Sequence, residues 1–144
     1  MSLYADTSCL LKLLWQEPET ARTEFLVNAE STVVVSDLAR LEVTVQIRAR
    51  RAAGLLTKRG AERLALQFET LVATPPFEMR ACAPSLIEDA RQQAGAARPR
   101  AHCRTLDRLH LAAMAGMGLR RLLTNDDGQA RAARTLGIRV VLPR

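Results

Sequence analysis

The chain has 144 residues, of which 48% are hydrophobic, and this content suits one domain with a buried core rather than a disordered or disulfide-stapled chain. Twenty-one Lys and Arg residues against fifteen Asp and Glu residues give a formal net charge of +6, nearly all of the positive charge being on Arg. Such a surface attracts polyanions, but an aromatic content of 3% excludes the stacking platform of a single-strand-binding protein.

The first half of the sequence alternates predicted strands and helices. A short strand at 3–5 precedes Asp6 and a helix that Thr7 or Ser8 can cap and that Pro18 ends. The next predicted elements are a helix at 19–29, a β-branched strand at 32–35, a helix that Ser36 caps and that ends near residue 53, and a helix at 57–72. We expect the last two helices to form a hairpin.

The second half continues this alternation after Pro75 and Pro76. Its predicted elements are a strand at 77–82, helices at 84–94 and 106–117 separated by a Gly-, Ala-, Arg- and Pro-rich stretch, a strand at 121–124, a helix at 129–136 and a strand at 138–142. Strands separated by helices indicate a sheet that is covered on both faces. The predicted fold class is therefore α/β, a three-layer α/β/α sandwich with a mostly parallel central sheet.

Three cysteines, Cys9, Cys82 and Cys103, lack any CxxC spacing, so the sequence predicts neither a disulfide framework nor a thiolate zinc site. We expect them to be reduced and buried, as in a cytoplasmic protein. Asp6 and Lys12 interrupt the apolar residues near the N-terminus, which argues against a secretory signal, and no apolar run reaches spanning length. We expect one domain, residues 1–144, without membrane association.

Two acids, Asp6 and Asp126, follow predicted strands. Ligands of open parallel sheets bind beyond the carboxyl ends of the strands, so these two carboxylates can meet there.

Two further acids, Glu42 and Asp107, lie on predicted helices. Glu42 shares a helix face with Leu38 and Val45, and Asp107 shares one with Leu111, so each helix is expected to aim an acid along a packed surface. An unpaired carboxylate taken out of water costs on the order of several kcal/mol. Four converging acids would therefore repel one another unless divalent cations neutralised them.

The predicted ligands are all carboxylate oxygens, which select Mg²⁺ or Mn²⁺ over zinc. Two such ions about 4 Å apart can activate a water and stabilise the departing oxygen of a phosphodiester. The expected chemistry is hydrolysis of a nucleic-acid backbone.

The order and spacing of these motifs resemble a known family. The segments that carry the likeness are Asp6-Thr7-Ser8 with Lys12, the helix start from Ser36 to Glu42, Thr105-Leu106-Asp107 with His110-Leu111-Ala112, Thr124-Asn125-Asp126, and Leu136-Gly137-Ile138-Arg139-Val140-Val141. Over essentially the whole chain they look like a PIN-domain ribonuclease of the VapC toxin type. The resemblance implies a PIN-like fold and a Mg²⁺- or Mn²⁺-dependent endoribonuclease that cuts RNA, forms a homodimer and is neutralised by a small antitoxin protein.

Carried over residue by residue, the resemblance assigns a catalytic and metal-binding cluster and two polar residues that support it. The matching acids are Asp6, Glu42, Asp107 and Asp126, and the supporting residues are Ser8 and Thr124.

Two of these assignments have rivals. Asp127 adjoins Asp126, and we prefer Asp126 because it keeps the family's Thr-x-Asp spacing, which leaves Asp127 free to cap the next helix. Asp37 rivals Glu42, but it falls in the first turn of its helix, where an acid needs no further role.

Other polar residues have ordinary structural explanations. His110 shares a helix face with Asp107 and could act as a base, but a packed, hydrogen-bonded histidine is the expected role. A solvated side chain is expected for Lys12. The run 48–51 could contact phosphates, although exposed helix faces are often basic. Asp107 itself could instead form a structural salt bridge, with Arg104, Arg108 or Arg131 as the partner.

The leucine- and valine-rich helices between Ser36 and Ala73 are expected to offer apolar ridges to a second copy and to an antitoxin, with ordinary core packing as the alternative. Two other function classes compete with the nuclease. One is a non-catalytic PIN-like module that binds nucleic acid or protein. The other is a phosphoacceptor receiver-like domain, whose tandem early acids are missing because Thr7 and Ser8 follow Asp6.

Overall fold

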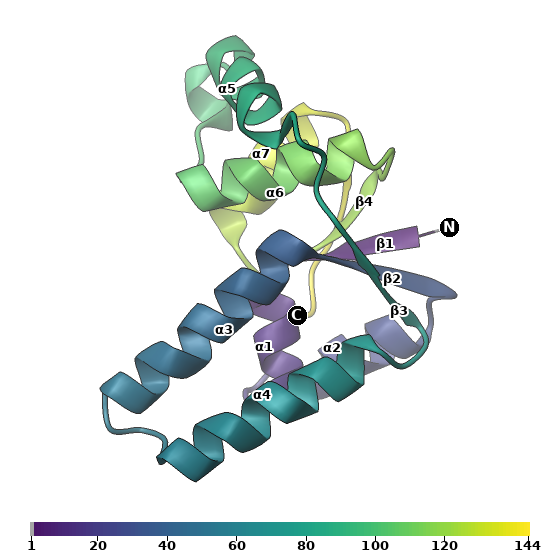
Figure 1. Ribbon diagram of the computed structural model, residues 1–144. Coiled ribbons are helices and arrows are strands. Elements are labelled where there is room, and N and C mark those ends of the chain that lie inside the picture. Colours follow the sequence, from purple (N-terminus) through teal and green to yellow (C-terminus); the bar gives the residue numbers. More distant parts are fainter. Residues whose placement is uncertain (1) are drawn as a thin grey trace.

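The fold is built on a five-stranded sheet in which every pair of neighbouring strands is parallel (Figure 1). The structure is a computed structural model that describes residues 2–144. The strand order is β3-β2-β1-β4-β5. The strands are β1 (Ser2–Ala5), β2 (Thr32–Ser36), β3 (Phe77–Arg80), β4 (Arg121–Leu123) and β5 (Arg139–Val141). The predicted α/β class is confirmed, and the sheet is parallel throughout the described residues.

Helices cover both faces of this sheet and make three layers. Those on one face are α1 (Thr7–Leu14), α2 (Thr20–Asn28), α3 (Asp37–Ala52) and α4 (Lys58–Val72). The other side has α5 (Leu86–Ala96), the short 3-10 helix η1 (Pro99–Ala101), α6 (Thr105–Gly116) and α7 (Asp127–Thr135), of which α6 and α7 pack on the sheet. Figure 1 shows α1–α4 below the sheet and α5–α7 above it.

Alternating side chains of the central strand β1 contribute to two separate cores. Leu3 and Ala5 pack with α1–α4, whereas Tyr4 packs with α6 and α7. This separation follows from the two-residue period of a strand. In the neighbouring strand β2, Val33, Val34 and Val35 are all fully buried, because a sheet covered on both faces has no solvent side.

The N-cap of α1 differs from the prediction. The helix begins at Thr7, and the carboxylate of Asp6 accepts a hydrogen bond from the Thr7 backbone N–H, so neither Thr7 nor Ser8 is the cap. An extended residue with an acceptor side chain directly before the first helical residue is the usual N-cap geometry. The predicted cap of α3 is confirmed, since Ser36 Oγ accepts a hydrogen bond from the Ala39 N–H.

At the start of α7 the helix cap is Asp126 and not, as predicted, Asp127. Asp126 is the N-cap, with Oδ1 2.8 Å from the Gln129 backbone nitrogen, and Asp127 is the first helical residue. The expectation that Asp127 caps this helix is therefore wrong. Thr124 Oγ1 accepts a hydrogen bond from the Asp126 N–H and holds the turn before the helix.

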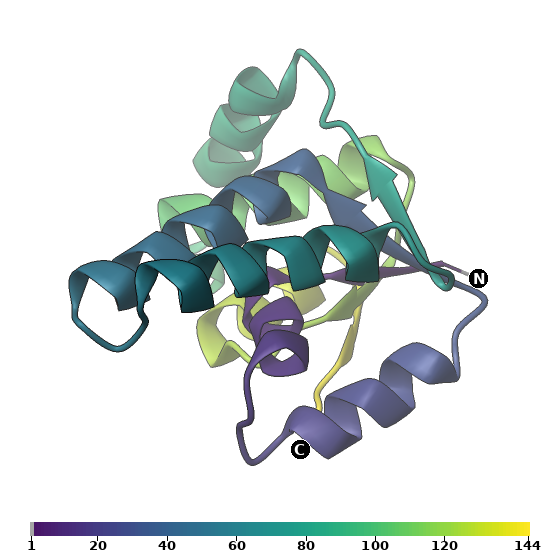
Figure 2. The same cartoon turned by 60° about the horizontal axis from the view of Figure 1, so that its bottom comes forward.

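The long helices α3 and α4 form the predicted hairpin and run side by side (Figure 2). Gly54, with φ +76°, lies just beyond the end of α3 in the left-handed conformation that glycine favours. The predicted packed face of α3 is wrong, however, because Val45 is 53% exposed. The buried residues of α3 are instead Ala39, Val43 and Ile47. Val43 directly follows Glu42, so the buried face lies next to the face that carries Glu42.

Two expectations about single side chains also fail. Lys12, expected in solvent, is buried, because Glu17 and Glu19 both accept hydrogen bonds from its ammonium group. Burial lowers the pKa of Lys12, but these two carboxylates outweigh it and raise that pKa. Cys9 is buried as expected, whereas Cys82 and Cys103 are only half-buried.

None of the helices described in residues 2–144 combines the length and the apolar character that a membrane span needs.

Candidate active site

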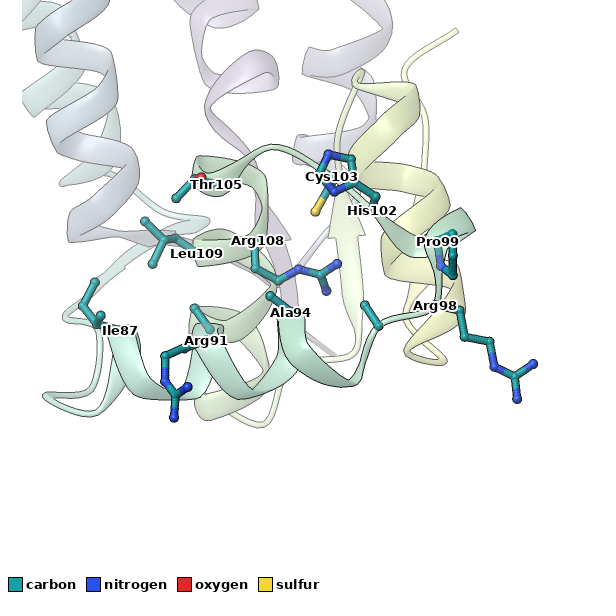
Figure 3. Close-up of a pocket in the computed structure, with 12 residues that line it drawn as sticks. Ile87, Arg91, Ala94, Arg98, Pro99, His102, Cys103, Thr105, Arg108 and Leu109 are labelled. Carbon is teal, nitrogen blue, oxygen red and sulfur yellow. The ribbon is translucent and has the colours of Figure 1, made fainter.

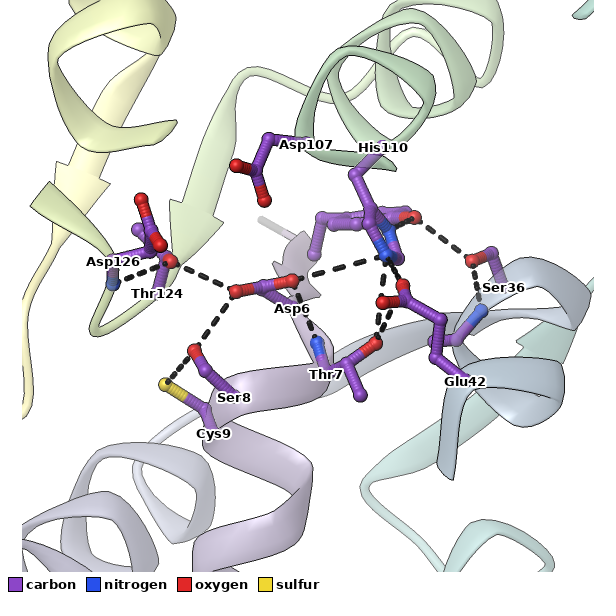
Figure 4. Close-up of polar contacts among 12 residues, drawn as sticks. Asp6, Thr7, Ser8, Cys9, Ser36, Glu42, Asp107, His110, Thr124 and Asp126 are labelled. Carbon is purple, nitrogen blue, oxygen red and sulfur yellow. Dashed lines mark hydrogen bonds and ion pairs between the residues drawn. The ribbon is translucent and has the colours of Figure 1, made fainter. Parts of the chain in front are cut away.

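Four acids from four separate segments line one cavity of about 370 Å³ at the carboxyl edge of the sheet. Asp6 follows β1 and Asp126 lies beyond β4, which pairs with β1. Glu42 comes from the second turn of α3, and Asp107 from the first turn of α6. The carboxylates of Asp6, Asp107 and Asp126 turn toward one another in Figure 4. The topology therefore brings together acids that are up to 120 residues apart, from 6 to 126.

Asp6 is fixed by hydrogen bonds on both carboxylate oxygens (Figure 4). Oδ1 accepts from the Thr7 N–H at 2.7 Å. Oδ2 accepts from Ser8 Oγ at 2.8 Å and from Thr124 Oγ1 at 2.9 Å. Ser8 and Thr124, which the family resemblance assigns as support for the acidic cluster, thus both contact Asp6. A buried carboxylate with three donors is held in one orientation.

Glu42 is held by side chains from α1 and α6. Its Oε1 accepts a hydrogen bond from Thr7 Oγ1 at 3.0 Å and contacts His110 Nε2. Burial alone would raise the pKa of Glu42, but the hydrogen bond from His110 and the positive charge of Arg104 outweigh burial and lower that pKa. Glu42 is therefore a carboxylate near neutral pH and keeps its other oxygen for the cavity.

His110 is 1% exposed and lies inside a buried chain of hydrogen bonds. Its Nδ1 is 2.7 Å from the Tyr4 hydroxyl, which lies 2.8 Å from Ser36 Oγ. Because a carboxylate can only accept, Nε2–H donates to Glu42. In the neutral ring this tautomer leaves Nδ1 as the acceptor of the Tyr4 hydroxyl. Burial raises the pKa of Tyr4, which keeps this phenol protonated as a donor. The predicted packed, hydrogen-bonded histidine agrees with this geometry, since both ring nitrogens are occupied.

Asp107 and Asp126 share one guanidinium. Arg104 Nε lies 3.0 Å from Asp107 Oδ2, and Arg104 Nη2 lies 2.8 Å from Asp126 Oδ2. Burial raises the pKa of Asp107, and the nearby charges of Asp126 and Asp6 add to the increase. Arg104 is therefore the partner of Asp107 among the three arginines that the sequence offers, and Arg108 is buried against Gln93 and the Ala101 carbonyl instead.

The rival acids lie outside the cavity. Asp127 is 76% exposed and pairs with Arg144. Asp37 accepts a hydrogen bond from the Cys82 backbone N–H and contributes no atom to the cavity lining. The geometry therefore favours Asp126 over Asp127, and Glu42 over Asp37, as acids of the candidate site.

Sequence reasoning missed Tyr4, Thr7 and Ser36 as members of the network. Two of them could have been found from the sequence, because Thr7 adjoins Asp6 and Tyr4 is a hydroxyl-bearing residue in a short apolar strand. Nothing in the spacing links Ser36 or Tyr4 to His110, because their contacts join segments more than 30 residues apart.

The residues of the cavity fit a hard divalent cation by their chemistry. Their donors are carboxylate and hydroxyl oxygens, which Mg²⁺ and Mn²⁺ prefer, and His110 is already engaged. Asp6 and Asp107 are both buried, and the charge balance around them relies on an arginine that is 77% exposed. Within residues 2–144, no three His, Cys, Asp or Glu side chains are gathered around one ligating centre. An ion would therefore have to draw these acids closer together.

A larger cavity of about 540 Å³ lies between α5 and α6 (Figure 3). Its lining is mainly apolar and includes Arg91, Arg98 and Arg108. His102 and Cys103 both line it, and no carboxylate side chain does. This cavity has no acid for hydrolysis, so the acidic cavity is the candidate active site.

The PIN domain family model matches residues 3–135. The chain is 31% identical to Ribonuclease VapC46 of Mycobacterium tuberculosis (strain ATCC 25618 / H37Rv) over 144 residues, which cover 99% of this chain and 98% of that protein.

Solved structures share the fold. FitAcB from Neisseria gonorrhoeae matches with a TM-score of 0.74 and 18% identity over 98% of this chain and 97% of that chain. DNA-bound VapBC from Salmonella typhimurium matches with a TM-score of 0.72 and 18% identity over 100% of this chain and 99% of that chain. Mycobacterium tuberculosis VapC20, described as a Sarcin-Ricin loop cleaving toxin, matches with a TM-score of 0.67 and 17% identity over 89% of this chain and 93% of that chain.

Proposed function

The chain belongs to the PIN domain family, and from this premise we propose that it is a metal-dependent endoribonuclease, the toxin of a toxin–antitoxin module. The observation that carries the proposal is the convergence of Asp6, Glu42, Asp107 and Asp126 on one cavity at the carboxyl edge of a parallel sheet. Similarity to Ribonuclease VapC46 over nearly the whole of both chains supports RNA as the substrate.

We assign Mg²⁺ or Mn²⁺ to the four acids. When bound, the ion supplies an activated water and stabilises the charge of the departing phosphodiester oxygen. Asp6 presents oxygens that Thr7, Ser8 and Thr124 have already oriented. Glu42 is kept ionised and immobile by His110. Asp6 and Glu42 are thus each held in one orientation before substrate arrives.

No side chain of the cavity is needed as the attacking group. His110 has both ring nitrogens in hydrogen bonds and is buried, so it positions Glu42 rather than acting as a free base. RNA approaches a chain whose formal net charge is +6, so electrostatic attraction favours association with the phosphate backbone.

The partners of this function are a second copy of the chain and a small antitoxin, in the cytoplasm. Exposed leucine and valine side chains on the α3–α4 hairpin support an interaction surface there, and they are Leu41, Val45, Leu55 and Leu66. A groove between α1 and α4, lined by Leu13, Leu14 and Leu66, adds apolar surface on the same side of the sheet.

The test is cleavage of total cellular RNA by the purified, antitoxin-free protein with Mg²⁺, with Mn²⁺ and with a chelator. We expect discrete fragments that require the metal. Asp6→Asn and Asp126→Asn should each lower the cleavage rate by at least about 100-fold, because each replaces a charged metal ligand by a neutral amide. Asn is also a good N-cap, so both helix starts are preserved.

The matched control is Asp127→Asn, which removes the same charge one residue outside the cavity and should cut RNA like the wild type. Circular dichroism establishes that all variants are folded. Intact RNA under every metal condition would reject the nuclease in favour of a non-catalytic binding module. Cleavage that survives Asp6→Asn would reject the assigned site.

A further inference from the structure

Arg104 forms ion pairs with two of the four acids that line the cavity. Its guanidinium reaches Asp107 with Nε and Asp126 with Nη2, at 3.0 Å and 2.8 Å. These acids come from different segments, and no other Lys or Arg in residues 2–144 forms an ion pair with either of them. One guanidinium thus bridges two carboxylates and offsets one unit of their combined negative charge.

The bridge is easily broken. The Arg104 side chain is 77% exposed, and the residue lies just before the first turn of α6 rather than within a packed element. Exposed ion pairs each shift an equilibrium by only about one- to fivefold, because water and salt screen them. Arg104 can leave without disturbing the core, whereas Asp107 is buried and must find another cation.

We propose that Arg104 is the resident counter-ion of the cavity, that it competes with the divalent metal ion for Asp107 and Asp126, and that the metal displaces it toward the RNA phosphate. This inference rests on the proposed function, because it concerns the same metal site. The absence of a preformed three-acid centre within residues 2–144 agrees with it, since Oδ2 of both acids faces the guanidinium.

The displaced guanidinium has a second use. Its planar fork matches the oxygens of a phosphate, and Arg104 both lines the cavity and is exposed to solvent. Metal binding therefore converts an internal ion pair into an available phosphate contact.

The experiment compares Mn²⁺ binding to the wild type, Arg104→Gln and Arg100→Gln by isothermal titration calorimetry without RNA. Arg100 is an exposed arginine four residues earlier, for which no ion pair with an acid is found in residues 2–144, so its replacement removes the same charge outside the cavity. Arg104→Gln should bind Mn²⁺ about three- to thirtyfold more tightly than the wild type, since it removes two competing ion pairs. Arg100→Gln should bind within about twofold of the wild type.

Thermal unfolding supplies a second readout that does not depend on cleavage. Saturating Mn²⁺ should raise the melting temperature more in Arg104→Gln than in the wild type, since a tighter ligand stabilises the folded state more at equal concentration. Equal Mn²⁺ affinity in Arg104→Gln and Arg100→Gln, or no Mn²⁺ binding by any variant, would overturn the counter-ion role.

RNA cleavage by the same preparations separates this inference from the proposed function. Tighter Mn²⁺ binding by Arg104→Gln, with no RNA cleavage by the wild type, would retain the counter-ion and reject the ribonuclease. Metal-dependent cleavage by the wild type, with unchanged Mn²⁺ affinity in Arg104→Gln, would retain the ribonuclease and reject the counter-ion.

Discussion

The hydrogen bond between His110 and Glu42 can be removed by a single substitution. His110→Phe keeps a planar ring of similar size but removes the donor to Glu42 and the acceptor for Tyr4. We expect about a 10- to 100-fold loss in Mn²⁺ affinity, the usual cost of losing a residue that orients a metal ligand. The Tyr4 hydroxyl would lose His110 and keep only Ser36 as a partner, so the free energy of unfolding should also fall by about 1 kcal/mol.

Calorimetry and urea unfolding measure these two effects, with His102→Phe as the matched control. His102 is the other histidine of the chain and is exposed outside the acidic cavity. If His110→Phe bound Mn²⁺ as tightly as His102→Phe, then His110 would have no part in positioning Glu42.

For single residues, the sequence predicts which acids line the cavity better than it predicts which side chains pair with them. Thr-x-Asp spacing selects Asp126 over Asp127, and that acid does line the cavity. The choice among Arg104, Arg108 and Arg131 as the partner of Asp107 could not be made, because a side chain with four rotatable bonds is directed by its surroundings. The burial of Lys12 could not be predicted for the same reason, because its partners Glu17 and Glu19 lie in an irregular segment whose path the sequence does not give.

Among the elements, a bidentate ion pair joins the loop before β2 to the start of β4. Arg121 Nη1 and Nη2 lie 2.8 Å and 2.6 Å from the two carboxylate oxygens of Glu30. The hydrogen bonds from Arg121 lower the pKa of Glu30. Since the folded pKa lies below the unfolded one, this stabilisation is present above the ordinary glutamate pKa of 4.5 and is lost as the pH falls through the folded pKa.

We therefore expect Glu30→Gln to lower the free energy of unfolding by about 1–2 kcal/mol at pH 7, with a smaller difference from the wild type below pH about 4. Urea unfolding at pH 7 and at pH 3.5 measures both values. Glu78→Gln, which removes an exposed glutamate that pairs with half-buried Arg80 two residues further on, is the control and should change little. A Glu30→Gln deficit that did not shrink in acid would contradict the linkage.

The order of strands and helices follows from the hydrophobic pattern, but the packed face of α3 does not. This helix carries apolar residues on two faces, and only contact with the sheet and α4 distinguishes buried Val43 from exposed Val45. The sequence predicts Thr7 or Ser8 and Asp127 as helix caps, whereas Asp6 and Asp126 are the observed ones. In the folded chain each of these two acids caps a helix and also lines the cavity.

Across the whole molecule, the basic surface near the cavity is expected to govern RNA affinity. Arg48 and Arg51 are exposed about 9 Å and 14 Å beyond Glu42 along α3, and they line a groove with Lys58. Arg50 differs, because its guanidinium stacks on Trp15 at 3.9 Å from the ring centroid. Arg48 and Arg51 are therefore better candidates for phosphate contacts than Arg50.

Arg48→Ala/Arg51→Ala should weaken RNA binding and reduce the slope of log affinity against log salt by about 1.4, or about 0.7 for each lost phosphate contact. Fluorescence anisotropy with chelator present measures binding without cleavage. Arg120→Ala/Arg139→Ala removes the same charge at the amino ends of β4 and β5, the opposite edge of the sheet, and should leave the slope near that of the wild type. Equal slopes in the two double variants would exclude Arg48 and Arg51 from the RNA footprint.

The strand order also sets when the cavity can exist during synthesis. β1 leaves the ribosome first, yet one of its two neighbours in the sheet is β4, which is made more than 100 residues later. Asp6 therefore has no Thr124 to hold it, and no Asp126 beside it, until the C-terminal segment has emerged. A chain that ends before Asp126 lacks the complete acidic cluster, so the proposed nuclease could form only after that residue has been added.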